Sequence, residues 1–119
     1  MSLDTHQIAE AFCSHRFAET YPYIADEIKW NIVGREEVLG REAVIARCAE
    51  SMKFLETVSP TITKLKIIHA ETLVVVEGAA QFQDHENQTS SVVASCDVFQ
   101  FSDEQLVEIT SCVIELNKP

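Results

Sequence analysis

The alternation of apolar and polar residues in the second half of the chain limits the fold more than any other feature. From Thr61 onwards the pattern has a period of two, and Val, Ile and Thr are plentiful, as strands prefer. The alternating stretches cover residues 61–69, 72–83, 90–101 and 106–116. Because the polar joins between them are short, successive strands should be antiparallel. This half of the chain therefore predicts an antiparallel meander of unusually long strands.

The chain begins with helical signals instead. Asp4 or Thr5 can cap a helix, because their side-chain oxygens can satisfy free backbone N–H groups. Pro22 pushes the residue before it out of the helical region, so this helix should end near Tyr21. A short helical turn is expected over residues 22–25.

A strand and a second helix separate this opening from the meander. Residues 27–33 alternate as a strand does, residues 35–39 read as an acidic loop, and residues 41–58 predict an amphipathic helix. Helices followed by strands indicate an α+β fold. Because such long strands must bend in a small domain, we expect a cone: a strongly curved antiparallel or mixed sheet wrapped by about three N-terminal helices.

Length and charge narrow the class of protein. The 119 residues fit a single domain over 1–119, and a net charge of −10 repels nucleic acid phosphates and anionic lipids. No apolar run approaches the roughly 20 residues of a membrane span, and the N-terminus is polar. We therefore expect a cytoplasmic protein that binds neither nucleic acid nor membrane.

The four cysteines predict neither a zinc site nor a disulfide framework. Cys13, Cys48, Cys96 and Cys112 are widely spaced, and none forms a CxxC pair or joins a Cys/His cluster. Each lies in an apolar stretch, where a free cysteine behaves as a small hydrophobe. We expect four reduced, buried thiols, and no metal or cofactor.

Three segments, in this order and spacing, carry a resemblance to a known family. YPYIADEIKWNIVG (21–34) resembles its passage from helix to first strand, GREAVI (40–45) its "G-[RK]-[DE]-A-[VI]" helix entry, and VVASCDVFQF (92–101) its "D-x-F-x-F" strand. The family is the nuclear transport factor 2-like superfamily, which includes ketosteroid isomerases and SnoaL-like polyketide cyclases. The resemblance implies the cone fold. Because the superfamily includes enzymes, binding modules and assembly domains, it does not fix the function.

Asp97 is the leading candidate for chemistry. It lies mid-strand among apolar residues, where an aspartate either finds hydrogen-bond partners or stays protonated. In the ketosteroid isomerases a similar strand position holds a protonated carboxylic acid that donates to the developing oxyanion. The resemblance thus implies an acid that faces a pocket. The alternative is a structural side chain that holds a neighbouring loop or helix.

The chain departs from the isomerase pattern at two places. Asn31 falls where the isomerases keep their general-base aspartate, and an amide does not titrate near neutral pH. The first helix also lacks the family's catalytic tyrosine. Asn31 is then either a ligand-orienting amide or a strand-end amide in water, and Tyr23 either contacts a ligand or packs with its hydroxyl in water.

Glu77 and His15 are the candidate bases. By strand parity Glu77 shares a face with Gln81. If that face lines the cone, Glu77 and Asp97 both project inwards and one pKa rises; if it faces solvent, Glu77 is simply hydrated. His15 either looks into the cone or lies on the surface of its helix. Trp30, Met52 and Phe99 are core residues or pocket lining.

These residues predict a small-molecule-binding domain of SnoaL-like type with an apolar pocket. If it is an enzyme, it transfers protons, as an isomerase, dehydratase or cyclase, with Asp97 as acid and Glu77 or His15 as base. The predicted ligand contacts are Tyr23, Trp30, Asn31, Met52, Gln81 and Phe99. The alternatives are a non-enzymatic dimerisation or ligand-sensing domain, in which the sheet joins a homodimer, and a collapsed cone with no ligand.

Overall fold

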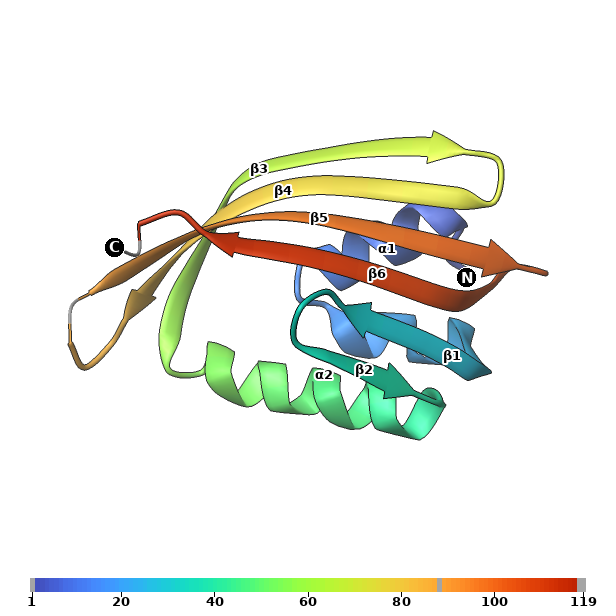
Figure 1. Ribbon diagram of the computed structural model, residues 1–119, viewed down its shortest axis with the longest axis horizontal. Coiled ribbons are helices and arrows are strands. Elements are labelled where there is room, and N and C mark those ends of the chain that lie inside the picture. The colour runs from blue at the N-terminus through green and yellow to red at the C-terminus, as the bar shows by residue number, and fades with distance from the viewer. Residues whose placement is uncertain (1, 88, 118–119) are drawn as a thin grey trace.

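The computed structural model describes residues 2–87 and 89–117. Its elements, in chain order, are α1 (Thr5–Cys13), the 3-10 helix η1 (Phe17–Tyr23), β1 (Ile24–Ile32), β2 (Glu36–Leu39), α2 (Arg41–Leu55), β3 (Val58–Ala70), β4 (Leu73–Asp84), β5 (Ser90–Ser102) and β6 (Gln105–Glu115) (Figure 1). The helices precede the four long strands, so the predicted α+β order is confirmed.

The six strands in the described part of the chain form one sheet in the order β2-β1-β6-β5-β4-β3. The last four strands make the predicted antiparallel meander, whereas β1 pairs with β6 in parallel, so the sheet is mixed. Irregularities in register interrupt the β1–β6, β3–β4 and β5–β6 ladders. Such irregularities bend strands and increase their twist. The sheet accordingly curves strongly, and β3 swings from the far edge down to α2 (Figure 1).

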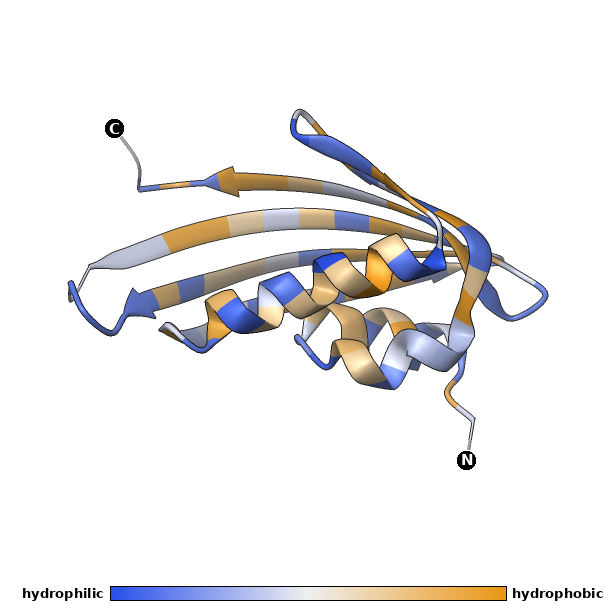
Figure 2. Cartoon of the chain, turned by 90° about the horizontal axis from the view of Figure 1, so that it is seen from below, coloured by the Kyte–Doolittle hydropathy of each residue, from blue (hydrophilic) through white to orange (hydrophobic). Residues whose placement is uncertain are grey.

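The helices lie together on the concave side of the sheet (Figure 2). Apolar residues of α1, β1 and β4–β6 meet there in one buried cluster. Phe12 is near its centre, with edge-to-face ring contacts to Phe17, Trp30 and Phe99 at centroid distances of 5.0, 5.2 and 5.5 Å. Such contacts add to the stabilisation from burial alone. The convex side of the meander has no helix over it in these views (Figure 2).

The first helix begins as predicted but ends early. The Asp4 carboxylate accepts a hydrogen bond from Gln7 N at 2.8 Å, and Gln7 Oε1 accepts one from Asp4 N at 2.9 Å, which makes a capping box. The helix ends at Cys13 rather than near Tyr21. The cause is a left-handed residue, His15, with φ of 66°.

The backbone closes this helix end as a Schellman motif. The Arg16 N–H donates to Ala11 O at 2.8 Å, and the His15 N–H donates to Phe12 O at 3.3 Å. After the turn the chain continues as η1, which replaces the short turn expected over 22–25. The motif turns His15 out of the helical direction and leaves it beside the cone.

Two further differences concern exposure and pairing. The expected loop 35–39 contains strand β2, which pairs with β1 in a hairpin. Of the four cysteines, Cys48 alone is buried, Cys13 is half-buried, and Cys96 and Cys112 are exposed, so the expectation of four buried thiols is wrong. Within the described residues, no helix combines the length and apolarity needed to cross a bilayer.

Candidate functional site

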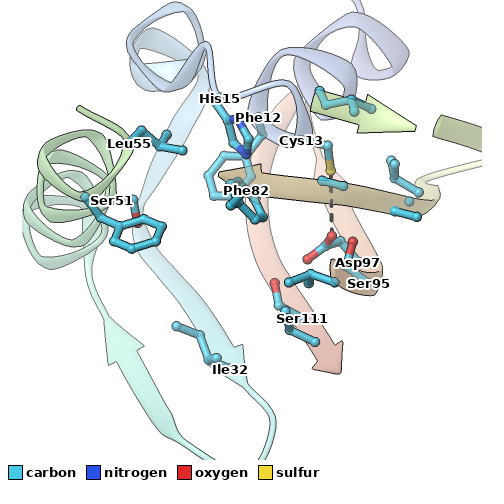
Figure 3. Close-up of a pocket in the computed structure, with 18 of the residues that line it drawn as sticks. Phe12, Cys13, His15, Ile32, Ser51, Leu55, Phe82, Ser95, Asp97 and Ser111 are labelled. Atoms are coloured by element: carbon cyan, nitrogen blue, oxygen red, sulfur yellow. Dashed lines mark hydrogen bonds between the residues drawn. The ribbon is translucent and has the colours of Figure 1, made fainter. Parts of the chain in front are cut away.

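A cavity of about 550 Å³ lies under the arch of the sheet. Its walls come from α1, η1, β1, α2 and the concave faces of β3–β6 (Figure 3). Most of the inner wall is apolar and includes Phe12, Phe17, Trp30, Leu55, Val76 and Phe82. Charged residues also line it, and three of them, Arg35, Glu50 and Lys64, are exposed. An apolar hollow with a few polar groups is the usual form of a small-molecule site.

Asp97 is an acid in the wall of this cavity. It lies half-buried on the concave face of β5, and Cys13 Sγ donates to its Oδ2 at 3.7 Å across from α1 (Figure 3). Burial raises the pKa of Asp97 above its ordinary 3.8, and hydrogen bonds from Ser111 and Cys13 oppose that rise. Because its pKa is raised, this carboxyl stays protonated to a higher pH than an exposed aspartate does.

Ser111 orients the acid from the neighbouring strand. It is the register partner of Asp97 in the β5–β6 ladder, and its Oγ accepts a hydrogen bond from Trp30 Nε1 at 2.9 Å. An indole N–H can only donate, so the Ser111 oxygen serves as its acceptor and the Ser111 hydroxyl proton is free to point to Asp97. A chain of hydrogen bonds therefore runs from β1 through β6 to the acid on β5.

His15 contributes a second titratable group to the same cavity. The centroid of its ring lies 6.0 Å from those of both Phe17 and Phe82. His15 and Phe82 are labelled next to each other in Figure 3. Burial lowers the pKa of His15 below its ordinary 6.5, so the imidazole is neutral at pH 7. In residues 2–87 and 89–117, no side chain or backbone group hydrogen bonds to its ring nitrogens. One ring nitrogen can therefore accept a proton from a bound molecule.

Glu77 lies on the other face of the sheet. Its carboxylate pairs with Lys64 Nζ at 2.8 Å, and this hydrogen bond holds the pKa of Glu77 below its ordinary 4.5. Strand parity explains the placement: Val74 and Val76 point into the core, so the odd-numbered residues of β4 point outwards. The possibility that Glu77 and Asp97 share the cavity is thus contradicted, and Gln81 is likewise exposed outside it.

The remaining predicted ligand contacts divide between core and surface. Trp30 lines the cavity. Asn31, next to it, lies on the opposite face of β1 because successive side chains alternate. The Tyr23 hydroxyl accepts a hydrogen bond from Leu3 N at 2.9 Å and ties the N-terminus to the core. Phe99 is fully buried core and Met52 is 42% exposed, and neither lines the cavity.

Cys13, Ser111 and Phe82 line the cavity although the sequence patterns did not single them out. Cys13 and Ser111 join Asp97 through tertiary contacts that no local spacing reveals. Phe82 is the one with a signal, since it shares the even face of its strand with Val74 and Val76. Among the described residues, no group of three or more His, Cys, Asp or Glu side chains is placed to hold a metal ion.

Sequence comparisons and structure comparisons give different results. No protein-family model matches the chain, and no curated protein matches its sequence. Solved structures do match. An LEH-like epoxide hydrolase from M. tuberculosis is 15% identical, with 92% of this chain and 81% of that chain covered and a TM-score of 0.68. A protein from Jannaschia sp. CCS1 assigned as a SnoaL-like polyketide cyclase is 12% identical, with 95% and 88% covered and a TM-score of 0.74. These two share the fold.

A third structure is similar in sequence as well. The NTF2-like protein of unknown function from Cytophaga hutchinsonii ATCC 33406 is 31% identical, and the alignment covers 90% of this chain and 93% of that chain with a TM-score of 0.79. Identity at this level over nearly the full length of both chains, together with the shared cone, establishes kinship: the chain belongs to the NTF2-like family.

Proposed function

We propose that this protein binds an apolar small molecule in the cone and transfers a proton on it, with Asp97 as the acid. The observation that carries the proposal is a half-buried carboxyl in the cavity wall, held by Ser111 and Cys13. The fold relatives named as an epoxide hydrolase and a polyketide cyclase support an enzyme-type domain for small molecules.

The size and walls of the cavity favour a ligand that is mostly hydrocarbon. Its volume of about 550 Å³ falls within the roughly 300–1,000 Å³ of typical ligand sites. Apolar residues, among them five Phe and Trp, supply most of the lining, so burial of apolar ligand surface would provide most of the affinity. The polar groups inside would orient the ligand and supply the smaller part of the affinity.

Two titratable groups with opposite roles support proton transfer. Asp97, with its raised pKa, can donate a proton or a hydrogen bond to a developing oxyanion. Neutral His15 can accept a proton from carbon or oxygen of the same molecule. Because Asn31 faces away from the cavity and Glu77 lies outside it, His15 is the base that we assign. Isomerisation, dehydration and cyclisation all fit this pair.

Thermal-shift screening with hydrophobic small molecules tests the binding step. Ligands that occupy the cavity should raise the melting temperature by mass action. Asp97→Asn should weaken the best ligand about tenfold or more, because it removes a charge-capable hydrogen-bonding group. Glu77→Gln is the matched control, since it alters a carboxylate on the outer face and should leave binding unchanged.

Turnover of an identified ligand tests the chemical step. The wild-type protein should convert it, and Asp97→Asn and His15→Gln should each abolish most of that conversion while the fold persists by circular dichroism. Full turnover by the Asp97→Asn variant would remove the proposed acid. A screen in which no hydrophobic compound shifts the melting temperature would remove the binding role as well.

The outer face favours a second function, homodimerisation through the sheet. No helix covers this face in Figure 2, and Ile114 on β6 is 63% exposed. Apolar residues such as Val75 and Val98 continue the patch across β4 and β5. Light scattering should report twice the 13.3 kDa chain mass, and Ile114→Lys should restore the monomer. A wild-type monomer at high concentration would count against the dimer.

A further inference from the structure

Two of the four cysteines face each other on the outer surface of the sheet. Cys96 on β5 is the register partner of Cys112 on β6, and both are exposed. Register partners in a ladder project to the same face. This pair lies on the convex face, because the next rung of the ladder, Asp97 with Ser111, faces the cavity.

The backbone hydrogen bonds fix how far apart the two cysteines are. Leu116 N donates to Val92 O at 2.7 Å, which marks that rung as a hydrogen-bonded pair. Rungs of this kind recur every second residue, and the ladder shows no register shift between this end and the Cys96–Cys112 rung. The Cα atoms of such a pair are about 5.5 Å apart. This distance lies within the roughly 4.4–6.8 Å that disulfides span between Cα atoms. The Cβ atoms of a hydrogen-bonded pair, about 5.5 Å apart, must approach to roughly 3.5–4.5 Å when the bond closes. Closure therefore strains this part of the ladder and makes the disulfide easier to reduce.

Small reagents can reach this pair. A shallow hollow of about 330 Å³ lies over the cysteines, and Lys64, Glu77, Cys96, Cys112 and Ile114 are among its lining residues. By contrast, Cys48 is buried in the core and Cys13 is tied to Asp97 inside the cone. The chain thus separates an accessible pair of thiols from two shielded ones.

We propose that Cys96 and Cys112 are a redox modification site that closes reversibly into an intramolecular disulfide across β5 and β6. The oxidant class is a low-molecular-weight disulfide, such as glutathione disulfide. One cysteine thiolate attacks the reagent's S–S bond, forms a mixed disulfide and releases one reagent thiol. The second cysteine thiolate then attacks the protein sulfur of that mixed disulfide and releases the other reagent thiol. The protein gives up two electrons and two protons, and the reagent takes both.

The disulfide would lie directly behind the candidate acid. Cys96 precedes Asp97 and Cys112 follows Ser111, so the cross-link joins the two strand positions adjacent to the Ser111–Asp97 hydrogen bond. Closing it restricts the relative movement of these two strands. An exposed disulfide is also among the more easily reduced kinds, which makes the modification reversible.

Mass spectrometry of the folded protein treated with glutathione disulfide tests the inference. The protein is kept dilute, where association through this face is disfavoured by mass action. We expect the intact mass to fall by two hydrogen atoms, and peptide mapping to link Cys96 with Cys112 while Cys13 and Cys48 stay free. Dithiothreitol should restore the starting mass. Cys96→Ser and Cys112→Ser should each stop at the mixed disulfide, with one glutathione added.

A displaced pair is the matched control. The double variant Cys112→Ser/Ile114→Cys keeps the number of cysteines and keeps both sulfurs on the outer face, but places them on a diagonal. Diagonal Cα atoms are about 7–8 Å apart, too far for a disulfide without backbone movement. This variant should collect glutathione adducts and form no internal cross-link.

Three results would overturn the proposal. The wild-type protein could keep all its thiols or carry only glutathione adducts. The cross-link could join two copies of the chain, seen as a covalent dimer on a non-reducing gel. The diagonal variant could close as readily as the wild type, which would show that register does not govern the reaction.

Discussion

The two faces of the sheet formed by β4, β5 and β6 place similar chemical groups in opposite surroundings. On the concave face Asp97 and Ser111 lie beneath α1, and burial raises the pKa of the acid. On the convex face Glu77, one strand away, lies in water beside Lys64, and that lysine lowers the pKa of its carboxyl. Strand parity, which sets the face on which a side chain lies, therefore decides whether the pKa of each acid is raised or lowered.

The first prediction compares how much apolar side chains on the two faces contribute to the free energy of unfolding. Phe99 is fully buried on the concave face and Val98, its neighbour, is half-buried on the convex face. Phe99→Ala should cost about 3–5 kcal/mol in the free energy of unfolding, because it leaves a cavity beside Phe12. Val98→Ala should cost about 1 kcal/mol, since less apolar surface is involved. Urea unfolding measures both losses. Equal losses would mean that the concave face contributes no more to stability than the convex face.

The second prediction tests the hydrogen-bond chain on the concave face. Ser111→Ala should lower the free energy of unfolding by about 1–3 kcal/mol, because it leaves the buried Trp30 N–H without its acceptor. It should also raise the pKa of Asp97 further, since the Ser111 hydrogen bond lowers it. Carbon-detected NMR titration of the Asp97 carboxyl measures this shift.

The neighbouring residue on the convex face serves as control for that experiment. Thr110→Ala removes a hydroxyl one position along β6, on the other face. It should cost under about 1 kcal/mol, within the range of strand propensities, and leave the pKa of Asp97 where it was. If Asp97 has the same pKa in Ser111→Ala as in the wild type, the serine does not hydrogen-bond to the acid.

The third prediction concerns the pH dependence of stability that arises from Asp97 on the concave face. The pKa of Asp97 is higher in the folded protein than its ordinary 3.8, so the folded state binds this proton more tightly. The contribution is fully present below pH 3.8 and is lost as pH rises through the raised pKa. Asp97→Asn cannot titrate, so its stability relative to wild type should increase with pH across that interval. A constant difference from acid to neutral pH would mean that burial does not perturb the acid.

The sequence predicted the sheet well because its signal is local. Alternation located all four long strands to within a few residues, and the length of those strands implied curvature. The same alternation defines two faces but cannot say which one is concave. The sequence therefore allows two placements for Glu77 and Gln81, and the structure selects one of them, because α1 packs on β4 and Val74 and Val76 are buried.

The site was less predictable because long-range contacts build it. Ser111 meets Asp97 only through the β5–β6 register, and an irregularity at Gln100/Phe101 shifts that register between the turn and the site. His15 reaches the cavity because a Schellman motif ends α1 early. The left-handed residue of that motif is usually glycine, so a histidine at this position does not indicate a helix end. Asn31 corresponds to a catalytic position of the ketosteroid isomerases, but it lies on the face of β1 opposite to Trp30 and so points away from the cavity.

The last prediction is that Glu77 on the convex face changes stability with pH in the opposite direction to Asp97. The pKa of Glu77 is lower in the folded protein than its ordinary 4.5, because Lys64 stabilises the carboxylate. Its contribution to stability is therefore present above pH 4.5 and is lost as pH falls through the lowered pKa. Glu77→Gln should lose stability relative to wild type at neutral pH and match it in acid. The effect should be the smallest of the set, and salt should weaken it further, because exposed ion pairs are screened. If the stability of Glu77→Gln relative to wild type instead rises with pH, as that of Asp97→Asn is expected to do, the contrast between the faces is broken, since both carboxyls would then have raised pKa values in the folded protein.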